Sequence, residues 1–103
     1  MIILGWNRDF EDISWPDYDE AYEDFRKYRI LMDLRWSVGR HKNIPVGSFC
    51  ALVVQGQKYP RGMVALGLTS TEPYADTHFN PKHGGLTNYV GWEMAVPDQY
   101  RAD

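Results

Sequence analysis

The sequence of 103 residues is long enough for one domain with a hydrophobic core of its own, and too short for two. Its composition, 44% hydrophobic and 15% aromatic, excludes a disordered chain, and a single cysteine excludes an internal disulfide. The net charge of −3 offers no general attraction to nucleic acid, but the charges are unevenly placed: acids crowd the segment from Asp9 to Asp33, and none lies from Leu34 to Thr71.

The first third of the chain predicts a strand, a helix and a second strand. The apolar run Met1–Gly5 is typical of a buried strand. Ser14–Asp17 predicts the start of a helix, because proline and acids are favoured in a first turn. Ile30–Trp36 reads as a strand with every second side chain apolar. Apolar residues recur every three or four positions along the predicted helix: Tyr18, Ala21, Tyr22, Phe25 and Tyr28.

The central part predicts a β-hairpin. Ser37–Ser48 is rich in Gly, Pro, Asn and Ser, which is typical of a loop. Phe49–Val54 is an apolar, β-branched strand, in which we expect Cys50 to be a buried small side chain. Gln57–Gly62 predicts a turn, and Met63–Thr69 predicts the returning strand.

The last third predicts a long loop and one more strand. The polar segment Glu72–Asn88 has a length that is more often functional or mobile than structural. Tyr89–Val96 predicts the last strand. Five strands, with one helix between the first two, predict an α+β, mainly β domain whose short strands curl into a small barrel. An open α+β sandwich is the alternative.

The sequence lacks the common catalytic and metal-binding motifs HExxH, GxSxG, GxxxxGK[ST] and GxGxxG. His78 and His83 share a loop with Asp76, which allows a metal site or a small hydrolase, but a polar loop with solvated histidines is the more frequent meaning. We therefore expect a binding domain with no catalytic residues, no cofactor and no metal. No signal peptide or bilayer-spanning stretch is present, which favours the cytoplasm.

Trp6 and Trp36 stand at the ends of predicted strands, where binding sites often gather. The small residues after Trp36 leave room for a flat ring against its indole, and the Ser37 hydroxyl can bond to the edge of that ring. One interpretation is that the two indoles stack against a nucleobase. The alternative is that both tryptophans are core residues.

The acid-free stretch carries several basic side chains. They form either one positive face, which attracts nucleic acid despite the acidic total, or scattered solvated charges. These residues are Arg35, Arg40, His41, Lys42, Lys58 and Arg61.

A succession of short motifs resembles the EVE domain of the PUA-like superfamily, in the version fused to HNH nucleases in modification-dependent (type IV) restriction enzymes. The resemblance covers nearly the whole chain, in order and with similar spacing. The motifs are Trp6-Asn7, Arg35–Gly39, Lys42–Gly47, Gln55-Gly56, Pro60–Gly67, Pro73-Tyr74, His78-Phe79 and Tyr89-Val90.

The chain departs from the family pattern in several places. Asn7 is followed by Arg8 rather than Pro, Gly47 is followed by Ser48 rather than Asp, and Phe79 replaces a Trp. The family also continues past the fifth strand, so we expect a shortened member, a truncated piece or part of a longer protein. No HNH motif is present, and any cleavage would reside in another domain.

The resemblance implies a curled five- to six-stranded β-barrel with one pocket for a base flipped out of DNA. The residues that it implies for the base pocket are Trp6, Asn7, Trp36, Ser37, Tyr74 and Phe79. Those that it implies for nucleic-acid contact are Arg40, His41, Lys42, Gln55, Lys58 and Arg61. For Gln55, a contact with the gap left by the flipped base and the closing of its own hairpin are equally open.

We therefore expect the specificity module of a restriction or defence system, which binds DNA carrying 5-methylcytosine, 5-hydroxymethylcytosine or another modified base. Its partners are modified DNA and, in a longer protein, an HNH nuclease domain; the oligomeric state stays open. The alternatives are a PUA-like module for RNA or a nucleotide, a small hydrolase, and a protein-interaction module that docks through Glu20 and Glu23 of the acidic helix.

Overall fold

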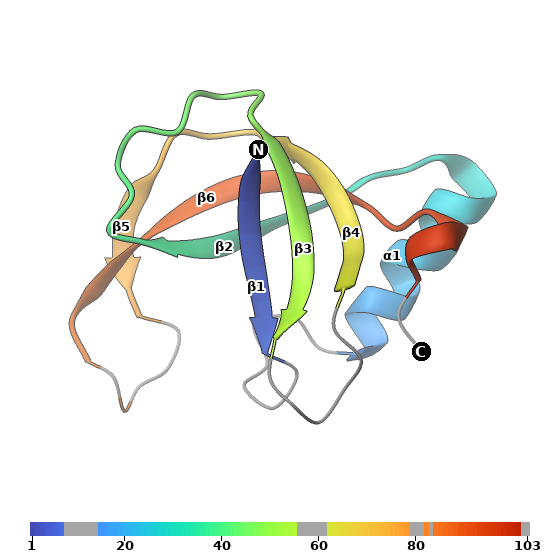
Figure 1. The fold of residues 1–103 in the computed structure, drawn as a ribbon, viewed down its shortest axis with the longest axis horizontal. Helices are drawn as coiled ribbons and strands as arrows, with labels where there is room; N and C mark the ends of the chain where they lie inside the picture. Colours follow the sequence, from blue (N-terminus) through green and yellow to red (C-terminus); the bar gives the residue numbers. More distant parts are fainter. Residues whose placement is uncertain (8–14, 56–61, 79–81, 83, 102–103) are drawn as a thin grey trace.

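The computed structural model describes residues 1–7, 15–55, 62–78, 82 and 84–101. Within these residues the fold is mainly β, with six strands, one α-helix and a short 3-10 helix (Figure 1). In chain order the elements are β1 (Ile2–Asn7), α1 (Trp15–Tyr28), β2 (Met32–Gly39), β3 (Phe49–Gln55), β4 (Gly62–Thr69), β5 (Tyr74–Thr77), β6 (Leu86–Ala95) and η1 (Asp98–Tyr100).

One sheet contains all six described strands, in the order β1-β3-β4-β6-β2, with β5 paired to β6 outside that path. Strand β1 runs parallel to β3, and the other pairs are antiparallel. In Figure 1, β2 and β6 pass behind β1, β3 and β4. The sheet is therefore curled, and one of its faces is turned inward. The predicted hairpin is confirmed by the register of β3 and β4, which places Phe49 opposite Leu68.

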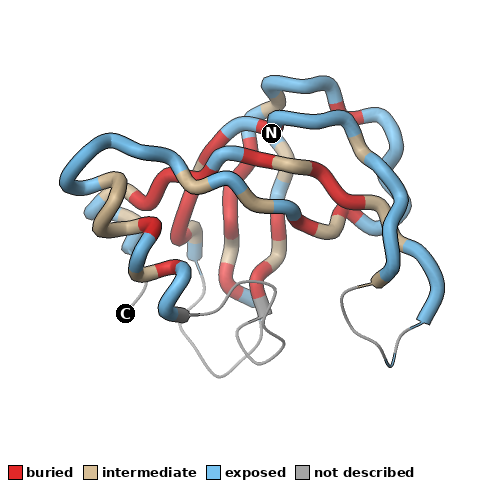
Figure 2. The backbone as a smooth tube through the Cα atoms, turned by 180° about the vertical axis from the view of Figure 1, so that it is seen from behind, coloured by how far each residue is buried: buried red, intermediate tan, exposed pale blue. Residues whose placement is uncertain are grey.

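The core lies on the enclosed face of the sheet, where residues of β1, β2, β3, β4 and β6 point inward and are buried. Figure 2 shows the buried stretches along the central strands, whereas β5 is exposed along its whole length. Cys50 is fully buried, as its apolar surroundings predict. The largest fully buried side chains include Trp6, Trp92, Tyr18, Tyr89, Leu4 and Leu52.

Helix α1 is fastened to this core by the apolar face that its spacing predicts. Tyr18 and Ala21 are buried, and the Tyr18 hydroxyl donates a hydrogen bond of 2.8 Å to the carbonyl oxygen of Val64 on β4. The helix ends because Arg29 takes a left-handed φ of 55° and its amide bonds back to the carbonyl of Phe25. Tyr28, predicted for the same face, is 68% exposed, since it lies in the last turn.

The predicted loop from Glu72 to Asn88 is wrong in part, because it contains all of β5 and the first residues of β6. Strand β5 is exposed at every position, so its sequence lacks the apolar alternation that marks a half-buried strand. Strand β4 begins at Gly62, which we assigned to a turn, and the rest of that turn lies outside the described residues.

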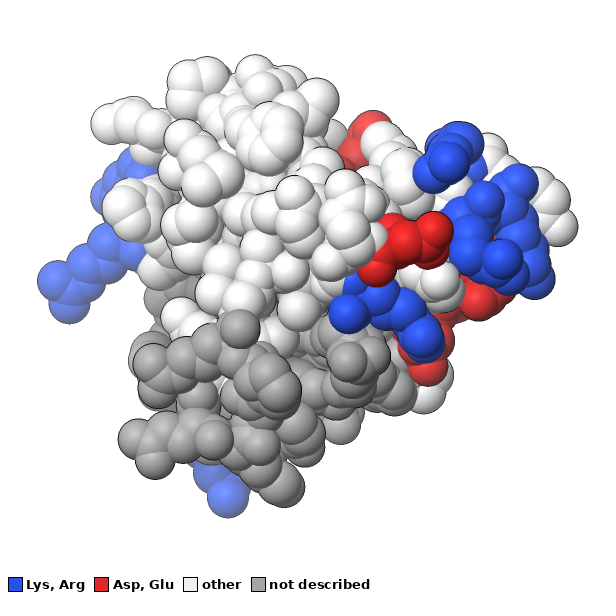
Figure 3. Space-filling model, turned by 45° about the vertical axis from the view of Figure 1, so that its right-hand side comes forward, with Lys and Arg blue, Asp and Glu red and all other residues white. Residues whose placement is uncertain are grey.

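Charged side chains gather around α1, where Figure 3 shows acidic and basic residues beside one another. Glu23 pairs with Arg26 and Lys27, and Asp19 pairs with Arg101. The negative charge of α1 is therefore partly neutralised by Arg26, Lys27 and Arg101.

Candidate functional site

Trp6 and Trp36 are core side chains in this structure rather than walls of an open pocket, which corrects the role we expected for them. Their exposed fractions are 1% and 2%. The Trp6 ring lies 5.2 Å from the ring of Tyr18, and Trp36 meets Trp92 edge to face at 6.3 Å. The indole Nε1 of Trp36 donates to the carbonyl oxygen of Gly5, 3.1 Å away. Burial of two large aromatic rings stabilises the interior of the curled sheet, and their apolar area explains why they lie there.

The other predicted base-pocket residues are only partly brought together. Ser37 on β2 and Tyr74 on β5 both lie opposite Tyr89, one on each side of β6. Tyr74 is 40% exposed, and its ring lies 6.1 Å from that of Tyr89. The backbone of Asn7 pairs with β3 at the far end of β1, but its side chain and the whole of Phe79 lie outside the described residues.

The predicted nucleic-acid contacts fall into separate places. Arg40, His41 and Lys42 are exposed and follow β2 directly. Gln55 is exposed at the opposite end of β3, where its side-chain amide lies against Gly5. Lys58 and Arg61 lie outside the described residues. Of the predicted contacts that the structure describes, only Arg40, His41 and Lys42 are therefore neighbours.

Among the described basic residues of the acid-free stretch, Arg35 is the one that forms an ion pair. Its guanidinium lies 2.9 Å from a carboxylate oxygen of Asp76 and 4.0 Å above the ring of Tyr89. The amide of Thr77 and the guanidinium of Arg35 both hold the pKa of Asp76 below its usual range. Asp76 is therefore ionised at neutral pH, and its charge is satisfied by these two groups.

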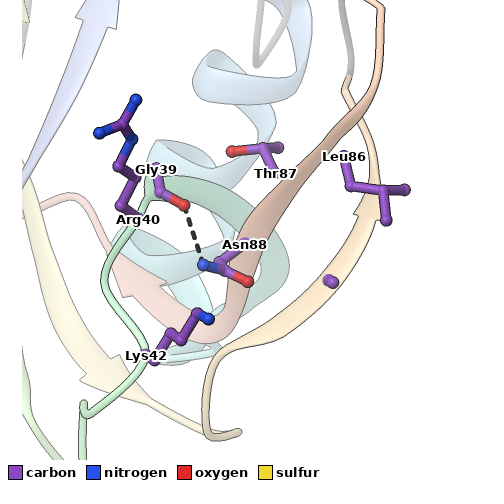
Figure 4. A pocket seen from close by; sticks show the side chains of 7 residues that line it. Gly39, Arg40, Lys42, Leu86, Thr87 and Asn88 are labelled. Atoms are coloured by element: carbon purple, nitrogen blue, oxygen red, sulfur yellow. Dashed lines mark hydrogen bonds between the residues drawn. The ribbon is translucent and has the colours of Figure 1, made fainter.

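A hollow of about 410 Å³ lies at the end of β2, between this strand, β5 and β6 (Figure 4). The pairing of β2 with β6 shifts register between Ser37 and Gly39, and Gly39 takes a left-handed φ of 63°. Irregular strand ends of this kind re-aim the residues that follow. The lining residues are Gly39, Arg40, Lys42, Ala75, Leu86, Thr87 and Asn88.

The hollow combines hydrogen-bonding groups with apolar surface. Asn88 Nδ2 donates to the carbonyl oxygen of Gly39 at 3.0 Å, and the Thr87 and Ser37 hydroxyls lie 3.2 Å apart. Leu86, 71% exposed, adds an apolar wall. A few placed polar groups beside apolar surface are typical of a small-ligand site.

The electrostatics of this hollow favour an anion. No acid lines it, and neither Arg40 nor Lys42 forms an ion pair with another described residue. Lys42 also lines a second hollow of about 320 Å³, which lies beside Asn43–Pro45 and is bordered by Glu72. One flexible ammonium group thus stands between two neighbouring hollows.

A third hollow, of about 440 Å³, is lined by His41 and not by the two cations beside it in the sequence. His41, Ser37 and Val38 line it together with Ile44 and the first residues of the chain, Met1–Ile3. Because Arg40 and Lys42 line the first hollow and His41 lines this one, His41 belongs to a different surface.

Sequence reasoning missed Ala75, Leu86, Thr87 and Asn88 as site residues, because it placed them in a polar loop. A signal was present: Gly84-Gly85 is a turn pair, and the residues after it lead directly into the apolar end of β6. This signal predicts that a strand begins at Leu86, and in the structure the start of that strand lies next to the end of β2.

The structure gives no support to the predicted alternative of a metal site at Asp76, His78 and His83. The part of the chain that the structure describes contains no group of three His, Cys, Asp or Glu side chains that could hold an ion, and His83 lies outside it. Asp76 is engaged by Arg35.

Among the described helices, none has the length and apolar character needed to cross a membrane. Comparisons with protein-family models, with curated proteins and with solved structures found no match to this chain, so its own residues and their geometry are what indicate a function.

Proposed function

We propose that this chain is a DNA-binding domain that accepts one modified base in the hollow between β2, β5 and β6. The observation that carries the proposal is the lining of this hollow, in which two cations without an ion pair among the described residues lie beside an amide, a hydroxyl and an apolar wall, with no acid. The phosphates on either side of a flipped nucleotide would meet Arg40 and Lys42, which adds sequence-independent affinity.

The size and chemistry of the hollow support a single base as ligand. Its volume of about 410 Å³ falls within the usual range for small-ligand sites. Flipping costs a few kcal/mol, which contacts to the edge and faces of the base offset. Leu86 and Ala75 offer apolar contact to a methyl group, which distinguishes a methylated base by about 1–3 kcal/mol.

The resemblance to the EVE domain supports the same function. The mainly β fold with a helix between its first two strands agrees with that resemblance. We propose that the sheet curls into the PUA-like barrel, and the hydrogen bond from Trp36 on β2 to Gly5 on β1, the two strands at the ends of the sheet order, supports it. In a restriction or defence system such a domain supplies specificity for 5-methylcytosine or 5-hydroxymethylcytosine, and an HNH nuclease domain is its partner.

The test is fluorescence anisotropy with DNA duplexes that differ only in one cytosine or adenine modification. We expect binding to one modified duplex, with an affinity that falls steeply as salt rises. The double variant Arg40→Ala/Lys42→Ala should weaken binding to all duplexes and lower the salt slope by about two. The matched control is Arg26→Ala/Lys27→Ala on α1, which removes the same charge and should leave binding unchanged.

Equal affinity for modified and unmodified duplexes, or no binding to any of them, would contradict the proposal. Single-stranded RNA of the same sequence forms a second arm, because tighter binding to RNA would identify an RNA-binding module instead. Release of cleaved or deaminated product would identify an enzyme.

A further inference from the structure

The side-chain amide of Asn88 is held in one orientation by its neighbour. The carbonyl oxygen of Gly39 can only accept a hydrogen bond, so the group that faces it at 3.0 Å has to be Nδ2 and not Oδ1. Figure 4 shows the consequence: Oδ1 points away from Gly39, toward the side where β5 lies. A rotation that exchanged the two atoms would place two acceptors against each other, which the bond prevents.

This orientation gives the hollow a fixed set of hydrogen-bonding groups. Among the described residues, none donates to Asn88 Oδ1 and none accepts the second Nδ2 hydrogen. In Figure 4 the ammonium of Lys42 points toward Asn88, whereas the guanidinium of Arg40 points away from it. The hollow therefore presents one hydrogen-bond acceptor, Asn88 Oδ1, beside two donors, Asn88 Nδ2 and Lys42 Nζ.

Resting on the proposed function, we propose that Asn88 is the specificity-determining residue of this hollow and selects bases with an exocyclic amino group over keto bases of the same shape. The Watson–Crick edge of cytosine presents the N4 donor followed by the N3 acceptor, which complements Asn88 Oδ1 and Nδ2 in turn. Thymine presents an acceptor, O4, at the position of the cytosine N4 donor, so two acceptors would face each other at Asn88 Oδ1. The Asn88 amide cannot rotate to relieve this without losing its hydrogen bond to the Gly39 carbonyl.

The test compares two duplexes that carry 5-methylcytosine or thymine at one position. These two bases share the ring methyl group and differ only along the edge that Asn88 would contact. Placing each opposite an abasic site removes the difference in pairing energy from the comparison. We expect the wild-type chain to prefer 5-methylcytosine by about 5- to 150-fold, the range for one bidentate base contact.

The decisive variant is Asn88→Leu, which keeps a side chain of similar size but has no hydrogen-bonding group. It should bind both duplexes with equal affinity and keep the salt slope of the wild-type chain, since Arg40 and Lys42 are intact. Asn43→Leu is the matched control, because it makes the same substitution at an exposed residue that does not line this hollow, and it should keep the preference. Chemical unfolding of each variant checks that it is folded.

The outcomes separate this inference from the proposed function. If the wild-type chain binds both duplexes equally, or if Asn88→Leu keeps the preference, the role of Asn88 is overturned while the DNA-binding site stands. If the wild-type chain binds neither duplex, the proposed function itself fails, and the role of Asn88 with it.

Discussion

The aromatic interior and the hollow at the end of β2 are built from opposite kinds of residue. Trp6 and Trp36 are at most 2% exposed, and their rings pack against other aromatic side chains. Lys42 and Asn88 lie beside open space and have few partners. The difference teaches that large indoles at strand ends can serve the core of a small domain, while polar groups line the open hollow in which we propose that recognition occurs.

The two regions are separate enough to be changed independently. Substitutions in the aromatic interior should alter the free energy of unfolding, and those in the hollow should alter binding. Each prediction below either breaks this division or sharpens it.

The largest expected effect is that of Trp36→Ala. Removal of a buried indole from a core costs about 3–5 kcal/mol, a large part of the stability of a domain of this size. Urea unfolding followed by circular dichroism measures it. A variant with wild-type stability that had lost DNA binding would instead make Trp36 a wall of the site.

Trp36→Phe sharpens the same comparison, because it keeps a smaller aromatic ring in place and removes the hydrogen bond to Gly5. We expect a loss of about 1–2 kcal/mol in the free energy of unfolding, from the unpaired carbonyl and the smaller ring. Affinity for modified DNA should not change in a titration of the folded variant.

Tyr18→Phe tests how α1 is attached to the sheet. The substitution leaves the buried carbonyl of Val64 without the donor that now lies 2.8 Å from it, at a cost of about 1–3 kcal/mol. The measurement is again urea unfolding, with Tyr28→Phe as control, because the exposed Tyr28 should tolerate the change. Equal stability of the two variants would contradict the role of the buried bond.

The smallest expected effect is the pH dependence contributed by Asp76. The Thr77 amide and Arg35 lower the pKa of this carboxyl, so its contribution to stability is fully present above the unfolded-state value near 3.8. That contribution is lost as pH falls through the lower folded value. Wild-type and Asp76→Asn chains should therefore differ in stability at pH 7 and converge below about pH 4. A difference in stability between the two chains that grew as pH fell would contradict the lowered pKa of Asp76.

The sequence predicted the buried parts of the fold better than the exposed parts. The helix face around Tyr18 and the hairpin of β3 and β4 follow from apolar periodicity, which records burial directly. Strand β5 is exposed at every position and is held by its pairing with β6, a partner that comes later in the chain. Periodicity carries no signal for such a strand.

The candidate site was predicted in part for a related reason. Arg40 and Lys42, which charge in an acid-free stretch singles out, line the hollow, but their contact with nucleic acid stays a prediction. Asn88 was missed, because its role depends on the carbonyl of Gly39 on another strand. Trp6 and Trp36 were assigned to a pocket from their positions at strand ends, and nothing in the sequence says which way a side chain points there.

The most direct test of the division between interior and hollow is NMR mapping of the chain during titration with a duplex that carries its preferred modified base. We predict that the largest amide shifts occur at Gly39–Lys42, at Ala75 and at Leu86–Asn88, and that the indole Nε1–H signals of Trp6 and Trp36 stay in place. The largest shifts at those two indoles, with Leu86–Asn88 unmoved, would contradict the account.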